Sequence, residues 1–343
     1  MGYEWLDSGL CKWIAGPEYF GNFREWVAGQ ASMMSYPWYA HLLEVALAGR
    51  LASALPVLVM AGEIFLGAAF VALAGWGAIR PWPRRVYPLG AAASLVGLLY
   101  AANLACYMGD VLRPAASNPF YEGVGLDVLL ALIHAVLFAL FLGGWRGAGA
   151  RARDPRTRGE PNWQGTLLLF QCLLAYEWLD SGASKLASHR FFASHFPEWV
   201  TDHAAILSPE WFAEMVRAAL ASFPSPAWAE AVAAGELVLG TALLAAALGR
   251  ARGRDARGAA PMGLAVSAAG VAYSLLLALY AGDAFLPLSA DPFDEGVSLN
   301  LVLLLVHAAL VAYYAANLRD PRARTATSTR ELGRGGLRPL VRV

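Results

Sequence analysis

The sequence predicts an all-α membrane protein of two tandem four-helix transmembrane bundles, related by a pseudo-twofold axis along the membrane normal. Composition is the first observation behind this prediction. Hydrophobic residues make up 58% of the chain, charged residues only 15%, and the mean hydropathy is +0.46, whereas roughly a quarter of a soluble domain is charged. The second observation is that the apolar residues form runs of about 20, the length that crosses a bilayer. The third is an internal repeat.

The repeat relates the two halves at an offset of 173 residues, the distance from Lys12 to Lys185. These are the only lysines in the chain, and both close a segment that begins Tyr-Glu-Trp-Leu-Asp-Ser-Gly. Matches at this offset continue at Glu63 and Glu236, Tyr107 and Tyr280, Asp110 and Asp283, Glu122 and Glu295, and His134 and His307. A fixed offset over the whole chain indicates a tandem duplication in which each half is one structural unit.

The domain boundaries follow from the repeat and from composition. Residues 1–143 form the first predicted four-helix repeat, and residues 163–318 form the second. Between them, residues 144–162 are rich in Arg, Gly and Pro, which predicts a solvated cytoplasmic linker. The Arg-rich tail, residues 319–343, is predicted to be disordered.

Apolar runs predict the individual spans. They lie near 163–186, 227–248, 261–281 and 297–317 in the second half, and near 53–78, 88–108 and 123–143 in the first. The first half has only Met1 and Gly2 before Tyr3, whereas the second half has the apolar run 163–175 before Tyr176. We therefore expect about eight spans in the natural protein, with the first one truncated or its start misassigned.

Arginine clusters set the predicted orientation. They follow the second and fourth spans of each half, and loops rich in positive charge face the cytoplasm. Both termini are then cytoplasmic, in a multi-pass protein of the inner cell membrane, and the Trp-rich loops face outward. Residues Trp211 to Leu220 predict an amphipathic helix on that outer surface, where it could cover a polar chamber. Ser208, Pro209 and Glu210 predict its N-terminal cap.

Ionisable side chains gather in the outer half of each predicted bundle. Glu177, Asp180 and Lys185 share one broad helix face, and Glu236 is expected at a depth similar to that of Glu177. A charge in hydrocarbon costs at least about 2.5–3.5 kcal/mol, so these residues should face the bundle interior and are functional candidates. The candidate catalytic residues are Lys185, Glu177, Asp180 and Glu236 in the second half, and Lys12, Glu4, Asp7 and Glu63 in the first. The candidate substrate or proton path comprises Asp110, Asp283, Glu122, Glu295, His134 and His307. No metal site is predicted.

These residues also have purely structural interpretations. Lys185 could extend to the membrane surface or pair with Asp180, although an arginine would extend equally well and an ammonium differs from it as a compact point charge. Several carboxylates face one lysine, so one carboxyl is expected to hold a proton, which suits either a proton relay or one inert hydrogen bond. The two histidines are either interior side chains or a bis-histidine haem pair. An outer aromatic belt or a wall for a quinone ring would contain Trp5, Trp26, Trp38, Trp178, Trp199 and Trp211.

The cysteine positions and the net charge bear on three further features: a CxxC pair, a disulfide and a nucleic-acid partner. Cys11, Cys106 and Cys172 contain no CxxC pair. A disulfide between Cys11 and Cys106 would have no counterpart in the second half, where Ser184 and Leu279 stand. The formal net charge is zero, so nothing indicates a nucleic-acid partner.

Two short motifs resemble the DoxX/DoxD superfamily of four-helix membrane proteins. One is Ser181-Gly182-Ala183-Ser184-Lys185, and the other is Gly235-Glu236-Leu237-Val238-Leu239-Gly240, which is followed by an Arg-rich turn. Within this superfamily, DoxD is the large membrane subunit of thiosulfate:quinone oxidoreductase, which passes electrons from extracytoplasmic thiosulfate to a membrane quinone. The residues that match by position are Lys12 and Lys185, Gly9 and Gly182, and Glu63 and Glu236. The chain departs from the pattern because it is a tandem fusion and does not include the small DoxA-like subunit.

The resemblance implies a subunit of a quinone-linked oxidoreductase, with thiosulfate or another sulfur substrate at the outer face. Its partners would be the lipid bilayer, a quinone and a small redox subunit. The lysines would hold an anionic substrate or a quinone oxygen, and the carboxylates would move protons. Two other hypotheses stand beside this one. One is a non-catalytic membrane module that binds a redox partner or lipid, and the other is a small-solute transporter, which parallel repeats with intramembrane charges also suit.

Overall fold

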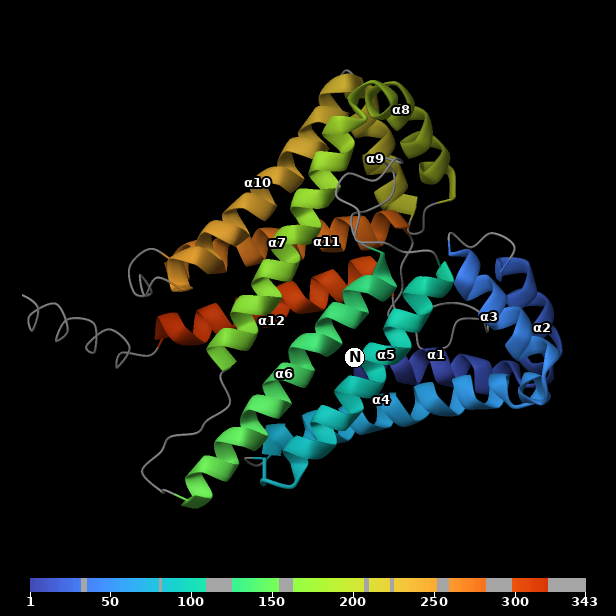
Figure 1. Cartoon of the computed structure of the whole chain (residues 1–343). Coiled ribbons are helices and arrows are strands. Elements are labelled where there is room, and N and C mark those ends of the chain that lie inside the picture. Colours follow the sequence, from blue (N-terminus) through green and yellow to red (C-terminus); the bar gives the residue numbers. More distant parts are fainter. Residues whose placement is uncertain are drawn as a thin grey trace, which may run out of the picture.

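The computed structural model is helical throughout the residues that it describes, which are 1–31, 36–79, 82–108, 125–153, 163–206, 210–222, 225–251, 259–281 and 298–319 (Figure 1). The first half contains α1 (Gly2–Ala15), α2 (Pro17–Ala31), α3 (Pro37–Ala48), the short 3₁₀ helix η1 (Arg50–Ser53), α4 (Leu55–Ile79), α5 (Val86–Met108) and α6 (Leu126–Arg153). The second half contains α7 (Trp163–Ala187), α8 (His189–Ile206), α9 (Glu210–Ser222), α10 (Ser225–Ala251), α11 (Ala260–Ala281) and α12 (Leu299–Arg319).

Six of these helices are long and apolar enough to cross a membrane: α4, α5, α6, α10, α11 and α12. The all-α membrane fold is therefore confirmed within the described residues. Helix α7 has 25 residues but is not among the six, because Glu177, Asp180 and Lys185 lower its hydropathy. Helix α1 has only 14 residues. The arrangement of eight spans in two repeats stays a prediction.

Each half is built from antiparallel helix pairs, in which α1 packs on α4, α5 on α6, α7 on α10 and α11 on α12. Glycines allow the close approach of α7 and α10. A Cβ atom at Gly182 would lie 2.9 Å from the carbonyl oxygen of Ala233, and one at Gly240 would lie 2.9 Å from that of Ala175. Gly182 and Gly240 therefore serve helix packing, as small residues commonly do between membrane helices.

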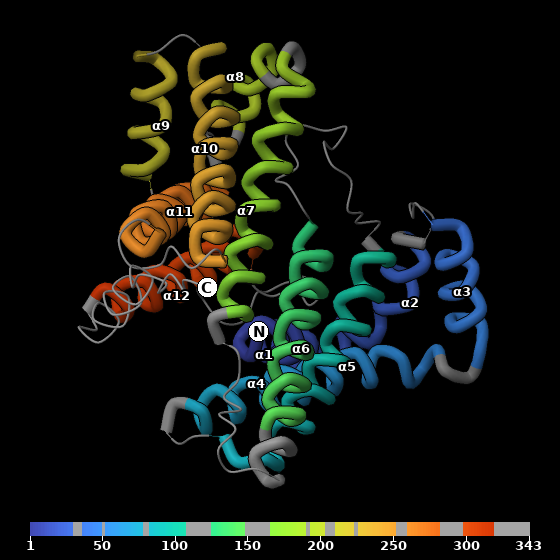
Figure 2. The backbone as a smooth tube through the Cα atoms, turned by 60° about the vertical axis from the view of Figure 1, so that its left-hand side comes forward, coloured from blue at the N-terminus to red at the C-terminus, as the bar shows by residue number. Residues whose placement is uncertain are grey.

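The two pairs of each half cross at a steep angle and do not lie aligned (Figures 1 and 2). This differs from the aligned bundle that the apolar runs suggest, because span length carries no information about crossing angle. Helices α6 and α7 lie side by side and join the halves through a shared core, which includes Leu129 and Ile133 of α6 and Leu174 and Trp178 of α7.

The short helices and the linker complete the fold. Helices α2 and α3 cover the end of the α1–α4 pair, and α8 and α9 cover the end of the α7–α10 pair (Figure 1). The predicted amphipathic helix is confirmed as α9, while Ser208 and Pro209 lie outside the described residues. Helix α6 extends into the predicted linker as far as Arg153, and the role of residues 144–162 as a cytoplasmic linker stays a prediction. The predicted disordered tail also lies outside the described residues beyond Arg319.

Candidate functional site

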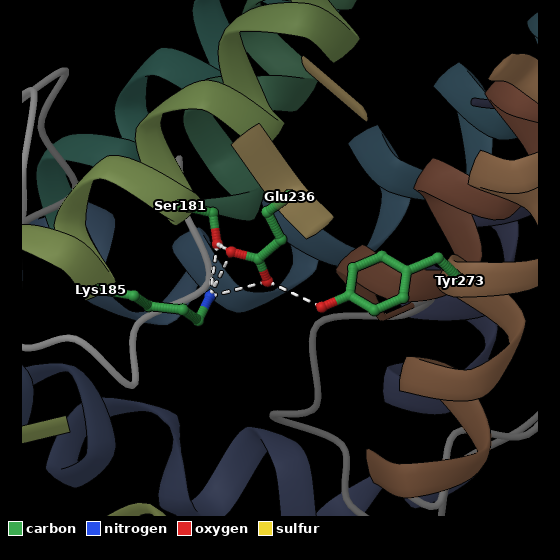
Figure 3. A network of polar contacts seen from close by, with 4 residues as sticks. All are labelled: Ser181, Lys185, Glu236 and Tyr273. Atoms are coloured by element: carbon green, nitrogen blue, oxygen red, sulfur yellow. Dashed lines mark hydrogen bonds and ion pairs between the residues drawn. The ribbon is translucent and has the colours of Figure 1, made fainter. Parts of the chain in front are cut away.

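The second half holds a buried network of four polar side chains, which point toward one another in Figure 3. The Lys185 ammonium donates hydrogen bonds to Ser181 Oγ at 2.6 Å and to both carboxylate oxygens of Glu236, at 2.9 and 2.8 Å. Ser181 Oγ donates to Glu236 Oε2 at 2.9 Å, and the Tyr273 hydroxyl donates to Glu236 Oε1 at 2.9 Å. The carboxylate is therefore the centre of the network.

Three helices bring these side chains together. Ser181 and Lys185 are four residues apart on α7, so they lie on one face, one turn apart. Gly182 lets α10 approach that turn, which places Glu236 level with Ser181. Tyr273 comes from α11, the helix that crosses the pair. The expectation that Glu236 lies as deep as Glu177 is therefore wrong by about one helical turn, because the antiparallel register is set by the glycine contacts and not by distance from the loop.

The first half repeats the network at the same offset. Lys12 donates to Ser8 Oγ at 2.6 Å and forms an ion pair with Glu63 at 2.9 Å. The Tyr100 hydroxyl donates to Glu63 Oε1 at 2.8 Å. The structure thus contains two copies of one lysine–serine–glutamate–tyrosine network.

Burial decides how the lysines are to be interpreted. Lys185 is only 7% exposed and Lys12 only 8%, so neither extends to the membrane surface. The partner of Lys185 is Glu236 and not Asp180. Taking two charges out of water is costly, and their attraction offsets that cost only with close geometry and further hydrogen bonds. The serine and tyrosine hydroxyls supply those further bonds.

Each network forms the floor of a cavity. The second cavity has a volume of about 360 Å³, and Lys185, Glu236 and Tyr273 line it together with apolar side chains of α8, α9, α10 and α11. The first has a volume of about 200 Å³ and is lined by Lys12, Glu63 and Tyr100 in the same way. A mostly apolar pocket with a few converging polar groups is the usual form of a small-molecule site.

The aromatic residues divide between the interior and the surface. Trp5 and Trp178 are each 2% exposed and donate their Nε1–H to His134 Nε2 and His307 Nε2, both at 2.9 Å. Their assignment to an outer belt is therefore wrong, since each closes a hydrogen bond inside its own half. Trp26 and Trp199 line the two cavities, and their role as a quinone wall stays a prediction.

The other tryptophans and both histidines agree with the simpler interpretations. Trp38 and Trp211 are 63% and 58% exposed, which suits a belt. His134 and His307 are fully buried side chains, each with one ring nitrogen engaged by a tryptophan. This arrangement does not favour a haem pair.

The remaining predicted site residues fall into two groups. Glu4, Asp7, Glu177 and Asp180 are buried as expected, and Glu4 lines the first of the two cavities described above. Asp110, Asp283, Glu122 and Glu295 lie outside the described residues. Within the residues that the structure describes, the cysteines form no disulfide, and no group of metal-ligating side chains occurs.

Sequence reasoning missed Tyr100 and Tyr273 as site residues. The signal was present, because both are tyrosines at the repeat offset inside otherwise apolar spans. Ser8 and Ser181 also belong to the site. No family model, curated protein or solved structure matches this chain.

Proposed function

We propose that this integral membrane protein binds a quinone in its two cavities and serves as the quinone-binding subunit of an oxidoreductase of the DoxX/DoxD kind. The observation that carries the proposal is the Lys185–Glu236–Tyr273 network on the floor of an apolar cavity of about 360 Å³. That size lies in the ordinary range of small-molecule pockets. A quinone matches it, because its ring is apolar and its carbonyl oxygens accept hydrogen bonds.

The charge balance favours a neutral ligand. Lys185 and Glu236 form an ion pair with 8% and 3% of their side chains exposed, so the floor carries no net charge when both are ionised. A thiosulfate dianion would have to leave water and approach the Glu236 carboxylate, which is costly in a low-dielectric site. We therefore assign the sulfur substrate to a surface shared with a redox partner and the quinone to the cavity.

The floor residues have definite roles in this proposal. Reduction of the quinone to the quinol takes two electrons and two protons, and oxidation of two thiosulfate ions to one tetrathionate releases two electrons. Lys185 exchanges one of its two hydrogen bonds to Glu236 for one to a quinone oxygen and stabilises the charge that develops there. Lys185 or Tyr273 supplies one proton to the quinone oxygen at the floor, and the other quinone oxygen takes its proton from water. Glu236 holds both donors in place, accepts one proton from water and passes it to the donor that has lost its own.

A lipid-binding module is the second candidate, since the same apolar walls suit an acyl chain. The two proposals predict different molecules bound to the purified protein. Protein purified from native membrane in mild detergent should carry quinone, measured by mass spectrometry of its organic extract. Stoichiometric phospholipid without quinone would support the lipid module instead.

Binding should also depend on the floor residues. A water-soluble tailless benzoquinone is titrated against the protein, and quenching of cavity tryptophans such as Trp199 and Trp228 is followed. In one variant both ion pairs are replaced without leaving a charge, through Lys185→Met with Glu236→Gln and Lys12→Met with Glu63→Gln. We expect its affinity to fall at least about tenfold, since each lost hydrogen bond costs on the order of 1 kcal/mol. Arg217→Met, a change of the same kind on the exposed face of α9, is the matched control. Equal binding by all three proteins would refute the proposal.

A further inference from the structure

The two cavities share most of their lining, so the positions at which they differ carry information. Aligned at the repeat offset, their floors are the same lysine, glutamate and tyrosine. Phe23 and Trp26 of the first cavity align with Phe196 and Trp199 of the second. Among the shared lining positions, Leu55 aligns with Trp228, whose indole N–H donates to the backbone carbonyl of Ala219 at 3.2 Å. Polarity also changes at two positions that contact each other in the first cavity.

Those two positions form one contact. In the first cavity, the Tyr39 hydroxyl of α3 donates a hydrogen bond to Asn103 Oδ1 of α5 at 2.7 Å. The matching residues of the second cavity are Phe212 of α9 and Leu276 of α11. Each exchange keeps nearly the same size, because phenylalanine lacks only the hydroxyl and leucine is nearly isosteric with asparagine. The difference at these two positions is therefore one side-chain hydrogen bond, which joins α3 to α5 and which Phe212 and Leu276 cannot form between α9 and α11.

The contact lies at the rim of the cavity. Tyr39 is buried, with 3% of its surface exposed, whereas Asn103 is exposed. The bond therefore joins α3 to the exposed side of α5. At the second rim, Leu276 is 46% exposed and Met215 is 47% exposed, which gives that cavity an apolar edge. The first cavity is also the smaller, at about 200 Å³ against about 360 Å³.

We propose that the Tyr39–Asn103 pair restricts the first cavity to a quinone without a hydrocarbon tail, whereas the Phe212–Leu276 rim lets the second accept a quinone whose tail extends into the bilayer. At the second rim, the tail contacts apolar side chains within the cavity and the hydrocarbon of the bilayer outside it. At the first rim it must separate the Tyr39–Asn103 hydrogen bond and leave both groups unpaired, which costs about tenfold in affinity or more. The inference rests on the quinone proposal and adds the determinant of tail specificity.

The test counts bound molecules of two probes, a tailless benzoquinone and its analogue with a ten-carbon tail. Wild-type protein in detergent should bind two tailless molecules per chain but only one tailed molecule, measured by equilibrium dialysis. Tyr39→Phe with Asn103→Leu should raise the tailed stoichiometry to two. Phe212→Tyr with Leu276→Asn should lower it to zero and leave the tailless stoichiometry at two.

The outcomes separate this inference from the proposal beneath it. Two tailed molecules bound to wild-type protein, or a tailed stoichiometry that neither exchange changes, would overturn the rim assignment while the quinone site stands. Failure of the tailless probe to bind would overturn both. Because the exchanges are nearly isosteric and leave the floor residues in place, tailless binding also reports that each variant is folded.

Discussion

The floors of the two cavities are alike, and their rims are not. Lys12 and Lys185 make the same contacts with serine and glutamate, and Tyr100 and Tyr273 hold the two carboxylates at 2.8 and 2.9 Å. Both halves therefore contain the same lysine, serine, glutamate and tyrosine, whereas Asp127, which also lines the first cavity, aligns with Asn300. A buried ion pair cannot lose one member cheaply, whereas a rim residue can change with little effect on folding. The comparison indicates that the floor defines the chemistry and the rim defines the ligand.

Removal of one lysine is expected to have the largest effect on stability. Lys185→Met should destabilise the protein by about 3–5 kcal/mol, because it leaves the Glu236 carboxylate buried without its partner. Lys12→Met should cost a similar amount. Thermal unfolding followed by tryptophan fluorescence measures both, and addition of Glu236→Gln or Glu63→Gln should restore much of the loss. A large cost in one half alone would show that the two floors are not equivalent.

Helix approach is the next largest effect. Gly182→Ala should destabilise by about 3 kcal/mol, near the upper end for overpacking, because its new methyl group would meet the Ala233 backbone. Gly235→Ala is the matched control on α10, where nothing lies within 4 Å of an added Cβ. It should be neutral or stabilise by about 0.5–1 kcal/mol, since alanine favours helix. Equal effects of the two changes in a denaturation experiment would contradict the close packing of α7 and α10.

The buried tryptophan–histidine bond should contribute less. Trp178→Phe leaves His307 Nε2 without its donor, which costs about 2 kcal/mol for a buried acceptor. Trp5→Phe should behave alike through His134. The surface change Trp211→Phe should have almost no effect on unfolding. A belt role for all three tryptophans would instead give three similar small changes.

The rim hydrogen bond should have the smallest effect on stability. Tyr39→Phe should cost about 0.5–1.5 kcal/mol, the usual net value of one hydrogen bond. Phe212→Tyr should give no matching gain, since Leu276 offers no acceptor. Unfolding curves of the two variants make the comparison, and an equal and opposite pair of effects would contradict the assignment of Asn103 as the partner.

Burial of the Tyr39 hydroxyl predicts a dependence on alkaline pH. Removal from water raises the pKa of Tyr39 from 10.0 to about 12. The folded pKa lies above the unfolded one, so the stabilisation is complete below pH 10 and is lost as the pH rises from 10 through 12. The loss of unfolding temperature across this interval should be smaller in Tyr39→Phe than in wild-type protein. An identical loss in both would show that other groups govern it.

Much of the site could be predicted from residue types and the repeat. The two lysines are separated by the repeat offset in a chain whose other basic residues are arginines, and two glutamates have the same separation. Inside an apolar fold, such charged side chains need partners. Tyr273 was missed because a tyrosine in an apolar span is ordinary by itself, and only its neighbour shows that its hydroxyl is used. Trp178 was misassigned for a related reason, since a tryptophan beside a membrane surface and one inside a core have the same sequence signature. Crossing angles and register depend on contacts between helices, so they could not be predicted from either helix alone.

By itself, the sequence determined the all-α membrane class and the recurrence of a lysine and its neighbouring carboxyl residues at an offset of 173 residues, because hydropathy and spacing are properties of the residues themselves. Only the tertiary structure decided that Lys185 pairs with Glu236 and not Asp180, that Trp178 meets His307, and that a cavity lies above each floor. These facts depend on which faces of different helices meet. Glycine contacts set the register of the two helices within a pair, and the crossing of the pairs determines which side chains meet between one pair and the other.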